Sequence, residues 1–508
     1  MAVFAEEPPP RPGRGMLKRF ALGGVLIFTL SAATVASAGL LQADALVTAF
    51  RSENTAIPGI ESALDDVDAG KPQTILVLGS DRRFVDIKQK NPVRSDTLLL
   101  VRLDPDKEVT AVMSIPRDLR VDIRTRRGVV TDKINAAYAL GGPKMSVQTV
   151  KTLLKIPINH VVNVNFGGFQ RAVNRLGCVY VDVDRDYFND NDPPAGGGPD
   201  YAAIDVNPGY QRLCGQDSLD FVRYRHFDND FVRAARQQEF LRQAKEQVGL
   251  GRLFSDRNEL LRIFGRYTDT DIADDNTAAI LRLLKLAFEA STNPIREVRF
   301  RGESGPTYVT ISPENLQRTV EEFVNARASS GPRATEAPKA GEESPTKRRR
   351  SSRRRSPGLP AGVVNARIEG EDFAAAASAR LSFPFYYSRA RLARGRYMYE
   401  KPRLYDIADR SGRRHRAYRV VVGVGDDGQY YGIQGTTWKR PPILDNPSSD
   451  KLRMRGRTYE QFFDGNRLRL IAWRTPRAVY WVSNTLSQIL SNAQMRAIAR
   501  SLSRVGER

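Results

Sequence analysis

Arginine and aspartate recur together in the first half of this 508-residue chain. The stretch FVRYRHFDNDFVRAARQQ, residues 221–238, holds four arginines and two aspartates among three phenylalanines. Asp81 ends an apolar run, Arg94 and Asp96 begin another, and Arg117 follows a third. Arginine keeps its charge when partly buried, and its planar fork matches two phosphate oxygens at once. Aspartates suit a hard cation. This combination predicts a pyrophosphate site that uses Mg²⁺ or Mn²⁺.

The spacing within residues 221–238 groups the cationic side chains. Arg223 and Arg225 are two residues apart, so in an extended chain they project from one face. Arg233, Arg236 and Gln237 follow at i, i+3 and i+4, which is one face of a helix, and an aspartate, Asp230, precedes them. A simpler alternative is that these arginines and aspartates pair only with one another.

Apolar runs and helical periods alternate around these residues and predict the elements that hold them. Such alternation is typical of an α/β sandwich in which helices cover both faces of a mixed central sheet. A long loop at 184–215 interrupts it, and Ser312 is a candidate N-cap of the last helix. The expected strands are 74–81, 95–104, 109–115, 160–166, 178–183, 297–303 and 307–311, and the expected helices are 134–140, 146–154, 167–177, 216–222, 231–249, 257–290 and 312–326.

Other chemistries find little support. No Walker loop is present, and the three histidines are scattered without a nucleophile elbow or a zinc-ligand spacing. GVGDDG at 423–428 matches a dinucleotide fingerprint in letters only, because strand-like QYYGIQG follows where that fingerprint needs a helix. We therefore place the chemistry in residues 72–327.

The N-terminus predicts export. Residues 1–19 carry several basic residues, and 20–43 form an uncharged apolar run long enough to span a bilayer. Basic residues before the span place the N-terminus in the cytoplasm and the bulk of the chain outside the cell membrane, after a neck at 44–71. A signal peptide cleaved near Ala38 is the alternative. The net charge of +21 favours a polyanionic partner, and export makes nucleic acid an unsuitable one.

Cys178 and Cys214 are the only cysteines. In an exported protein an isolated pair predicts one disulfide, worth roughly 3–4 kcal/mol for a loop of about 35 residues. Two buried free thiols are the alternative.

A second domain follows a linker. Residues 328–362 are rich in Pro, Ser and Glu and contain KRRRSSRRR, a composition that cannot bury a core. The basic run is either a solvated spacer or a contact for anionic wall polymers or lipid head groups. In residues 363–508, Tyr and Trp alternate through RAYRVVVGV, QYYGIQGTTW, LRLIAWRT and RAVYWVSN, which predicts a smaller, β-rich α+β domain. Because the arginine and aspartate sets lie upstream, we expect this domain to be dispensable for the chemistry and to bind wall material or a partner.

Several of these segments together resemble a known family. LVLGSD, RSDTLLLVRLD, VMSIPRDLRVDI, DKINAAYALGG, VNFGGF, LDFVRYRH and DFVRAARQQ occur in order over about residues 72–250 and are similar to the successive motifs of the LytR-CpsA-Psr family. The resemblance implies an envelope phosphotransferase that moves a glycopolymer from a polyprenyl-pyrophosphate carrier to peptidoglycan, as in teichoic acid attachment, with pyrophosphatase as a possible side activity.

The resemblance also assigns roles to residues. It implies that Asp81 and Asp96 hold Mg²⁺ and that Asp230 activates the acceptor hydroxyl, with Arg225 and Arg233 at the reacting phosphate. The implied pyrophosphate ligands are Arg94, Arg117, Arg223, Arg225, Arg233, Arg236 and Gln237. The competing function is a non-catalytic, extracytoplasmic protein that binds polyanions of the envelope. The resemblance stops before residues 363–508.

Overall fold

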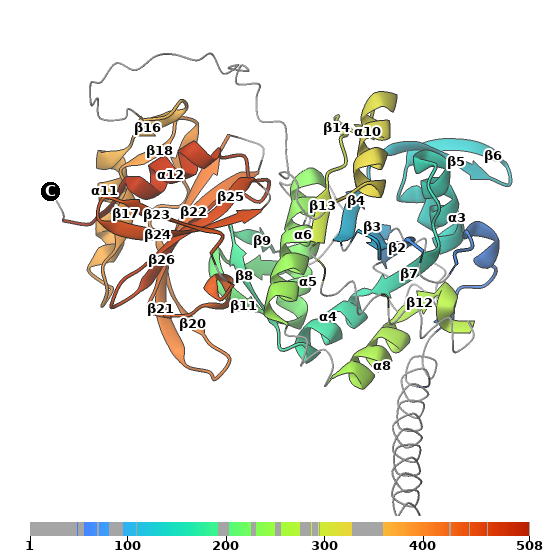
Figure 1. Ribbon diagram of the computed structural model, residues 1–508, viewed down its shortest axis with the longest axis horizontal. Helices are drawn as coiled ribbons and strands as arrows, with labels where there is room; N and C mark the ends of the chain where they lie inside the picture. Colours follow the sequence, from blue (N-terminus) through green and yellow to red (C-terminus); the bar gives the residue numbers. More distant parts are fainter. Residues whose placement is uncertain are drawn as a thin grey trace, which may run out of the picture.

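The computed structural model describes two domains, one from the first half of the chain and one from the end, which lie against each other (Figure 1). We call the first, within 55–327, the catalytic domain, because it contains the segment predicted to carry the chemistry, and the second, within 359–506, the C-terminal domain. The described residues are 48, 55–68, 71–80, 95–107, 109–190, 203–224, 230–248, 256–274, 286, 293, 295–327, 359–425, 428–446, 448–464 and 466–506.

A seven-stranded mixed sheet forms the centre of the catalytic domain. Its order is β1-β12-β7-β2-β3-β4-β13, with parallel pairs β1–β12, β7–β2 and β4–β13 and antiparallel pairs between. The strands are β1 (Thr55–Ala56), β2 (Gln73–Ser80), β3 (Ser95–Asp104), β4 (Val109–Ile115), β7 (His160–Asn165), β12 (Thr268–Thr270) and β13 (Ile295–Val298). The predicted mixed sheet is confirmed.

Helices cover both faces of this sheet, as predicted. On one face α3 (Ala136–Leu154) and α10 (Pro313–Val324) pack on Leu98, Leu100 and their neighbours. The other face of β3 carries Leu103, which contacts Leu286. Helix α3 contains non-helical backbone at Gly141 and Gly142, which explains why the sequence pattern reads as two helices. Ser312 caps α10 by accepting the Asn315 amide at 3.2 Å, as expected.

Beside the sheet lies a second layer built around a β-ribbon. Strands β8 (Val179–Val183) and β11 (Gly209–Leu213) pair antiparallel, and α4 (Phe166–Arg175), α5 (Gly215–Arg223), α6 (Asp230–Gln247) and α8 (Arg257–Tyr267) lie around them. The predicted disulfide is confirmed, because Cys178 and Cys214 are bonded. Each cysteine adjoins one member of the Val179–Leu213 pair, so the bond closes the open end of the ribbon.

Three expectations were wrong in detail, and one hairpin was not expected. The expected loop 184–215 contains β9 (Tyr187–Asn189), β10 (Ile204–Val206) and β11. The expected neck supplies β1 and a short helical turn, η1 (Glu61–Ala63). The expected helix 257–290 includes β12 and then the turn η2 (Asp271–Asp274). The hairpin of β5 (Arg120–Thr125) and β6 (Gly128–Lys133) was not expected. These strands are short or gain their partners from distant segments, so local periodicity does not reveal them.

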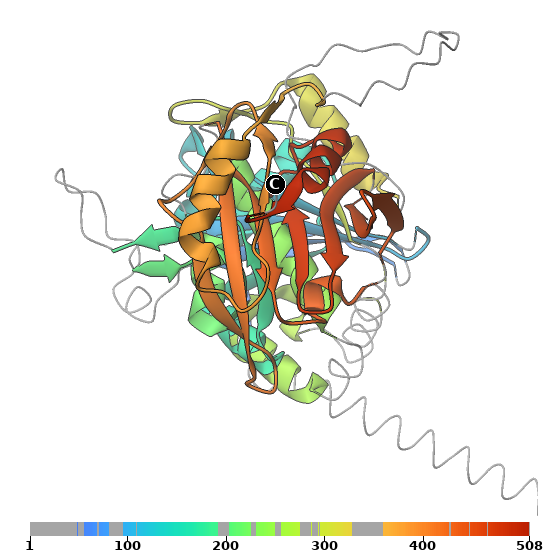
Figure 2. The same ribbon diagram turned by 90° about the vertical axis from the view of Figure 1, so that its left-hand side faces the viewer.

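The C-terminal domain is β-rich, as predicted. Its eight-stranded antiparallel sheet has the order β19-β21-β22-β26-β25-β24-β23, with β20 also on β21. Helices α11 and α12 lie on one face (Figure 2). The elements are β16 (Val363–Asn365), α11 (Arg367–Ser378), β17 (Tyr386–Ser388), β18 (Ala390–Leu392), β19 (Gly395–Tyr397), β20 (Arg403–Ala408), β21 (Arg414–Val424), β22 (Gln429–Thr436), η3 (Pro442–Leu444), β23 (Asp450–Met454), β24 (Arg457–Asp464), β25 (Arg467–Arg474), β26 (Val479–Ser483), α12 (Asn492–Arg500) and β27 (Leu502–Arg504); β14 (Glu303–Ser304) and β15 (Val309–Thr310) complete the catalytic domain.

The predicted membrane span, 20–43, and most of the predicted linker lie outside the described residues. Among the residues that are described, no helix has both the length and the apolar character needed to cross a bilayer.

Candidate active site

The strands next to the predicted metal-binding residues pair irregularly at one end of the central sheet. Ser80 at the end of β2 pairs with Ser95 at the start of β3, whereas the preceding residue, Gly79, pairs with Thr97. Asp96 is therefore the extra residue of a β-bulge, a feature that is common beside active sites. Asp81 follows Ser80 directly in the chain. The residue before Asp81 is therefore paired with the residue before Asp96.

The structure does not describe the two carboxylates themselves. Asp81 lies outside the described residues, and so does the side chain of Asp96. Within the described part of the chain no group of three or more His, Cys, Asp or Glu side chains could hold a metal ion. The donor set that the sequence predicts, two aspartates, supplies the oxygen ligands that Mg²⁺ prefers.

Gln237 connects helix α6 to this end of the sheet. Its Nε2 lies 3.3 Å from Thr97 Oγ1 and 3.2 Å from the carbonyl oxygen of Val222, and it donates to both. One side chain therefore joins α6 to β3, beside the bulge, and to α5. The predicted helix that carries Arg233 and Arg236 is thereby placed next to β3, the strand that contains Asp96.

Arg117 reaches the same region from β4. It follows Pro116, which lines one small cavity together with Phe231 and Ala234 of α6. Its Nε lies 3.8 Å from Asp118 Oδ1, and Lys133 Nζ lies 3.1 Å from the same oxygen. The Arg117 side chain is 17% exposed, so it keeps access to solvent while its backbone carbonyl anchors the Asn135 amide at 3.2 Å.

Arg223 is the last residue of α5, so the expectation of an extended chain at this position was wrong. Its Nε and Nη2 donate to Asp220 Oδ1 at 3.0 and 2.7 Å. The guanidinium also lies 5.7 Å from the ring centre of Phe166, at the end of β7. For Arg223 the simpler alternative, a pair between arginine and aspartate, is therefore realised in this structure.

Negative charge gathers around this arginine. Burial, followed by the carboxylates of Asp220 and Asp205, raises the pKa of Asp217. Because Asp217 and Asp220 share the short helix α5, Arg223 offsets part of their charge while it faces the end of β7.

Two arginines of α6 are buried. Arg233 is 7% exposed, and Arg236 is not exposed at all. The Arg236 guanidinium lies 4.7 Å from the ring centre of Tyr187 and 5.8 Å from those of Phe221 and Tyr224, and its Nη2 donates to the Tyr224 carbonyl at 2.5 Å. This enclosure holds Tyr224, the residue directly after α5, in place. These contacts of Arg236 are with the protein itself, and its binding to pyrophosphate stays a prediction.

The remaining predicted residues are only partly placed. Arg94 and Arg225 lie outside the described residues, and Asp230 is the first residue of α6 with a side chain that is not described. Of the predicted set, Arg117, Arg223 and Gln237 come to one end of the sheet, and Arg233 lies one turn before Gln237 on α6. Sequence reasoning missed Thr97 as the partner of Gln237 and Asp220 as the partner of Arg223. Two signals could have found them: Thr97 lies on the face of its strand opposite to that of Leu98, and Asp220 precedes Arg223 by three residues in a helix.

Comparison with known proteins gives a consistent result. Residues 39–323, more than half of the chain, match the model of the LytR_cpsA_psr family. A protein of Halalkalibacterium halodurans named polyisoprenyl-teichoic acid–peptidoglycan teichoic acid transferase TagU is 30% identical over 271 residues, which is 51% of this chain and 80% of the relative. The Bacillus subtilis transferase TagV is 36% identical over 173 residues, or 34% of this chain and 42% of the relative.

An uncharacterized Staphylococcus aureus protein is 28% identical over 259 residues, 49% of this chain. This chain spans 60% of that protein and 42% of the B. subtilis TagV. Among solved structures, TagT bound to LI-WTA is 27% identical and has a TM-score of 0.40, covering 51% of this chain and 93% of its own. The chain, through residues 39–323, belongs to the LytR_cpsA_psr family.

Proposed function

We propose that this protein is a phosphotransferase that moves a glycopolymer from a polyprenyl-pyrophosphate carrier to peptidoglycan. The observation that carries the proposal is the Gln237–Thr97 contact, which sets the arginine helix over the bulged strand of Asp96. Family membership and the transferase names of relatives that share this region support it. Location of the bulk of the chain outside the cell membrane, behind the apolar segment 20–43, is part of the proposal.

In this proposal the reaction is one displacement at phosphorus. A hydroxyl oxygen of the peptidoglycan acceptor forms a bond to the sugar-linked phosphorus, the bridging P–O bond of the pyrophosphate breaks, and polyprenyl phosphate leaves. Asp230 accepts the hydroxyl proton. If water replaces the acceptor, the same displacement is pyrophosphate hydrolysis, the side activity that the resemblance implies.

The protein's own residues bind and orient the two phosphates. Arg94, Arg117, Arg225 and Arg233 supply positive charge and forked donors, which are worth most where charge develops during phosphoryl transfer. Arg223 contributes from its pair with Asp220, and Gln237 fixes the helix. Asp81 and Asp96 would hold Mg²⁺, which when bound neutralises part of the phosphate charge.

The test uses the chain from residue 44 to 508 with a polyprenyl-pyrophosphate glycolipid, Mg²⁺ and peptidoglycan fragments. The expected product is a glycan joined to peptidoglycan by a phosphodiester, detected by mass spectrometry. Asp96→Asn is expected to abolish the metal-dependent reaction. Arg225→Lys is expected to lose about a hundredfold or more, nearly as much as Arg225→Ala, because lysine cannot replace the fork.

Arg350→Lys, in the basic linker, is the matched control and should retain full turnover. Absence of product from the unaltered chain would contradict the proposal. If turnover is seen but Arg225→Lys keeps most of it, the arginines act as general charge. Tight binding of polyanions without any product would favour the alternative, a non-catalytic envelope-binding protein.

A further inference from the structure

The sheet of the C-terminal domain is apolar on both faces. In β26, Tyr480 and Val482 face the helix-covered core, whereas Val479 and Trp481 belong to a different cluster. The same alternation occurs in the second half of β25, where Leu470 and Ala472 belong to the second cluster and Ile471 and Trp473 to the first. Members of this second cluster include Tyr180 and Tyr210, which come from the ribbon β8–β11 of the catalytic domain. The catalytic domain therefore covers the second face of the sheet.

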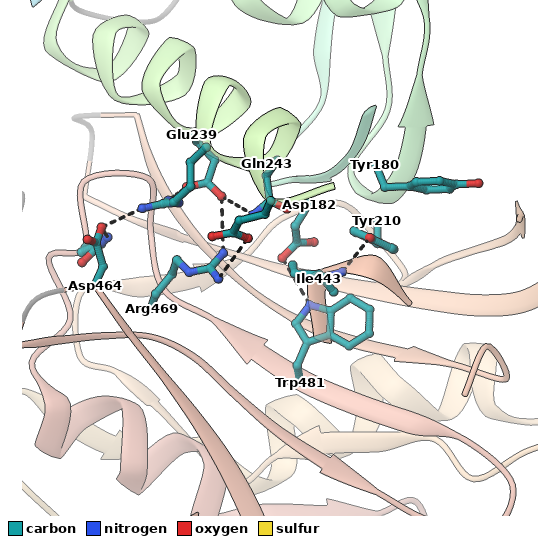
Figure 3. A network of polar contacts seen from close by, with 12 residues as sticks. Tyr180, Asp182, Tyr210, Glu239, Gln243, Ile443, Asp464, Arg469 and Trp481 are labelled. Carbon is teal, nitrogen blue, oxygen red and sulfur yellow. Dashed lines mark hydrogen bonds and ion pairs between the residues drawn. The ribbon is translucent and has the colours of Figure 1, made fainter. Parts of the chain in front are cut away.

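The ribbon is also divided by alternation. Val181 and Val183 pack inside the catalytic domain, while Tyr180 and Asp182, on the same strand, point to the C-terminal domain. Tyr180 OH donates to the Ala408 carbonyl at 2.9 Å. Tyr210 OH accepts the Ile443 amide at 3.0 Å, a bond that Figure 3 marks. Each strand of the ribbon thus serves two cores at once.

A buried ion pair lies at the centre of the interface. Arg419 Nη1 donates to Asp182 Oδ1 at 2.9 Å, with side chains only 1% and 7% exposed. Trp481 Nε1 donates to the other carboxylate oxygen at 3.3 Å. Asp182 therefore has partners for both oxygens, and all of them come from the C-terminal domain.

The approach of the two domains needs glycine on each side. A Cβ on Gly432 would lie 2.1 Å from Arg419 Cζ, so the guanidinium reaches Asp182 only because residue 432 has no side chain. On the catalytic side, Gly209 has φ +115°, and a Cβ there would lie 2.4 Å from the Tyr405 hydroxyl oxygen. Such close packing is typical of protein interiors and marks a permanent contact.

The interface also includes α6, the helix of the candidate site. Val232 and Ala235 pack on Leu486 of the C-terminal domain. Arg242 Nη1 lies 2.7 Å from Asp464 Oδ2. Arg469 lies 3.7 Å from Glu239 and 3.8 Å from Glu246 (Figure 3). These α6 residues are spaced by three and four positions, so they form one face: Val232, Ala235, Glu239, Arg242 and Glu246.

A different face of the same helix carries the site. Arg233 and Gln237 are one and two residues past Val232 and Ala235 in the chain, so they are rotated away from the C-terminal domain by about 100–200°. Gln247, at the end of α6, holds the backbone of Tyr180 from both sides, with its Oε1 accepting at 2.8 Å and its Nε2 donating at 2.6 Å. The helix is therefore fixed between the central sheet and the C-terminal domain.

We infer that the C-terminal domain positions α6 for catalysis, with Asp464 and Arg469 as positioning residues that act through Arg242, Glu239 and Glu246. The inference rests on the proposed function. It assigns to residues 363–508 a part in the reaction itself, contrary to the expectation that they are dispensable. A helix displaced by about 1 Å would misplace Arg233 and Gln237, and misplacement of that size lowers turnover by up to about a hundredfold.

The test compares the full chain with the double variant Asp464→Ala/Arg469→Ala. We expect kcat to fall about tenfold or more while KM for the lipid-linked donor stays within about threefold, because the residues do not touch substrate. Amide hydrogen exchange of α6 should become faster, while near-ultraviolet circular dichroism retains the signal of the folded C-terminal domain. Arg469→Lys should restore turnover, because separations of 3.7 and 3.8 Å require charge and not a fork.

The matched control is Arg391→Ala. Arg391 Nη2 lies 2.9 Å from Glu369 Oε2, between β18 and α11, away from the catalytic domain, so no change in turnover is expected. Unchanged kcat in the double variant overturns the inference, whether or not exchange changes. If the unaltered chain forms no product, the proposed function fails. In that case faster amide exchange of α6 in the double variant still supports the positioning of α6 by the C-terminal domain, and unchanged exchange overturns that positioning.

Discussion

Replacement of Asp182 by alanine should strongly destabilise the contact between the domains. The change leaves the guanidinium of Arg419, which is 1% exposed, without its carboxylate. Removal of one partner of a buried ion pair costs about 3–5 kcal/mol, because the remaining charge stays out of water. For a domain of about 150 residues each kcal/mol corresponds to about 2–4 °C, so the melting temperature of the C-terminal domain should fall by roughly 6–20 °C.

A double-mutant cycle tests this reasoning. Asp182→Leu combined with Arg419→Met removes both charges and should recover most of the loss, since apolar residues of similar size can replace a buried pair. The assay is thermal unfolding followed by tryptophan fluorescence, because Trp481 donates to the same carboxylate. Glu369→Ala, which breaks a half-exposed pair with Arg391, serves as the control and should cost less than about 1 kcal/mol.

A small effect would refute the interpretation. If Asp182→Ala costs less than about 1 kcal/mol, water reaches Arg419 in the variant and the interface opens easily. If the double variant is as unstable as Asp182→Ala, the loss comes from packing and not from the unpaired charge.

Three further predictions concern the same interface. Cys178→Ser should lower the free energy of unfolding by about 3–4 kcal/mol, measured by urea denaturation, because the bond restricts the unfolded chain and closes the ribbon; a variant as stable as the parent would contradict this. A chain ending after residue 327 should aggregate or lose turnover, since it exposes Tyr180 and Tyr210, and a soluble, fully active product would contradict the docking argument. Burial raises the pKa of Tyr210 well above its ordinary value. The contribution of neutral Tyr210 to stability is therefore present below about pH 10, where the unfolded phenol is also neutral, and is lost as pH rises through the folded pKa. Absorbance at tyrosinate wavelengths should show Tyr210 titrating only when the domains separate, and Tyr210→Phe should lose this part of the signal.

Much of the catalytic domain follows from local sequence. The bounds of β3 and β4 match the expected strands 95–104 and 109–115, because continuous apolar runs that include β-branched residues fit only buried strands. Ser312 caps its helix as expected, and the isolated cysteine pair is bonded. These features depend on residues close in sequence or on simple elimination, so the chain alone determines them.

The roles of individual arginines needed the tertiary structure. Arg223 and Arg236 look alike in sequence, yet one pairs with Asp220 at the site and the other lies enclosed by aromatic rings. Sequence spacing gave Arg223 an extended backbone, whereas packing against α4 and α6 completes a helix up to that residue. Burial and partner choice depend on which surfaces meet, and periodicity cannot specify that.

The docking of the C-terminal domain shows most clearly which features follow from sequence and which need the tertiary structure. Alternating Tyr and Trp in β26 already indicate a strand buried on both faces, because neither set of alternate residues is polar. What covers the second face is a ribbon almost 300 residues earlier in the chain: Asp182 and Trp481 are separated by 299 positions. The sequence by itself determined that both faces must be covered, since exposed apolar area is unfavourable. Only the folded structure decided that the catalytic domain covers one of them, because shape, glycine-dependent close approach and a buried ion pair select that partner.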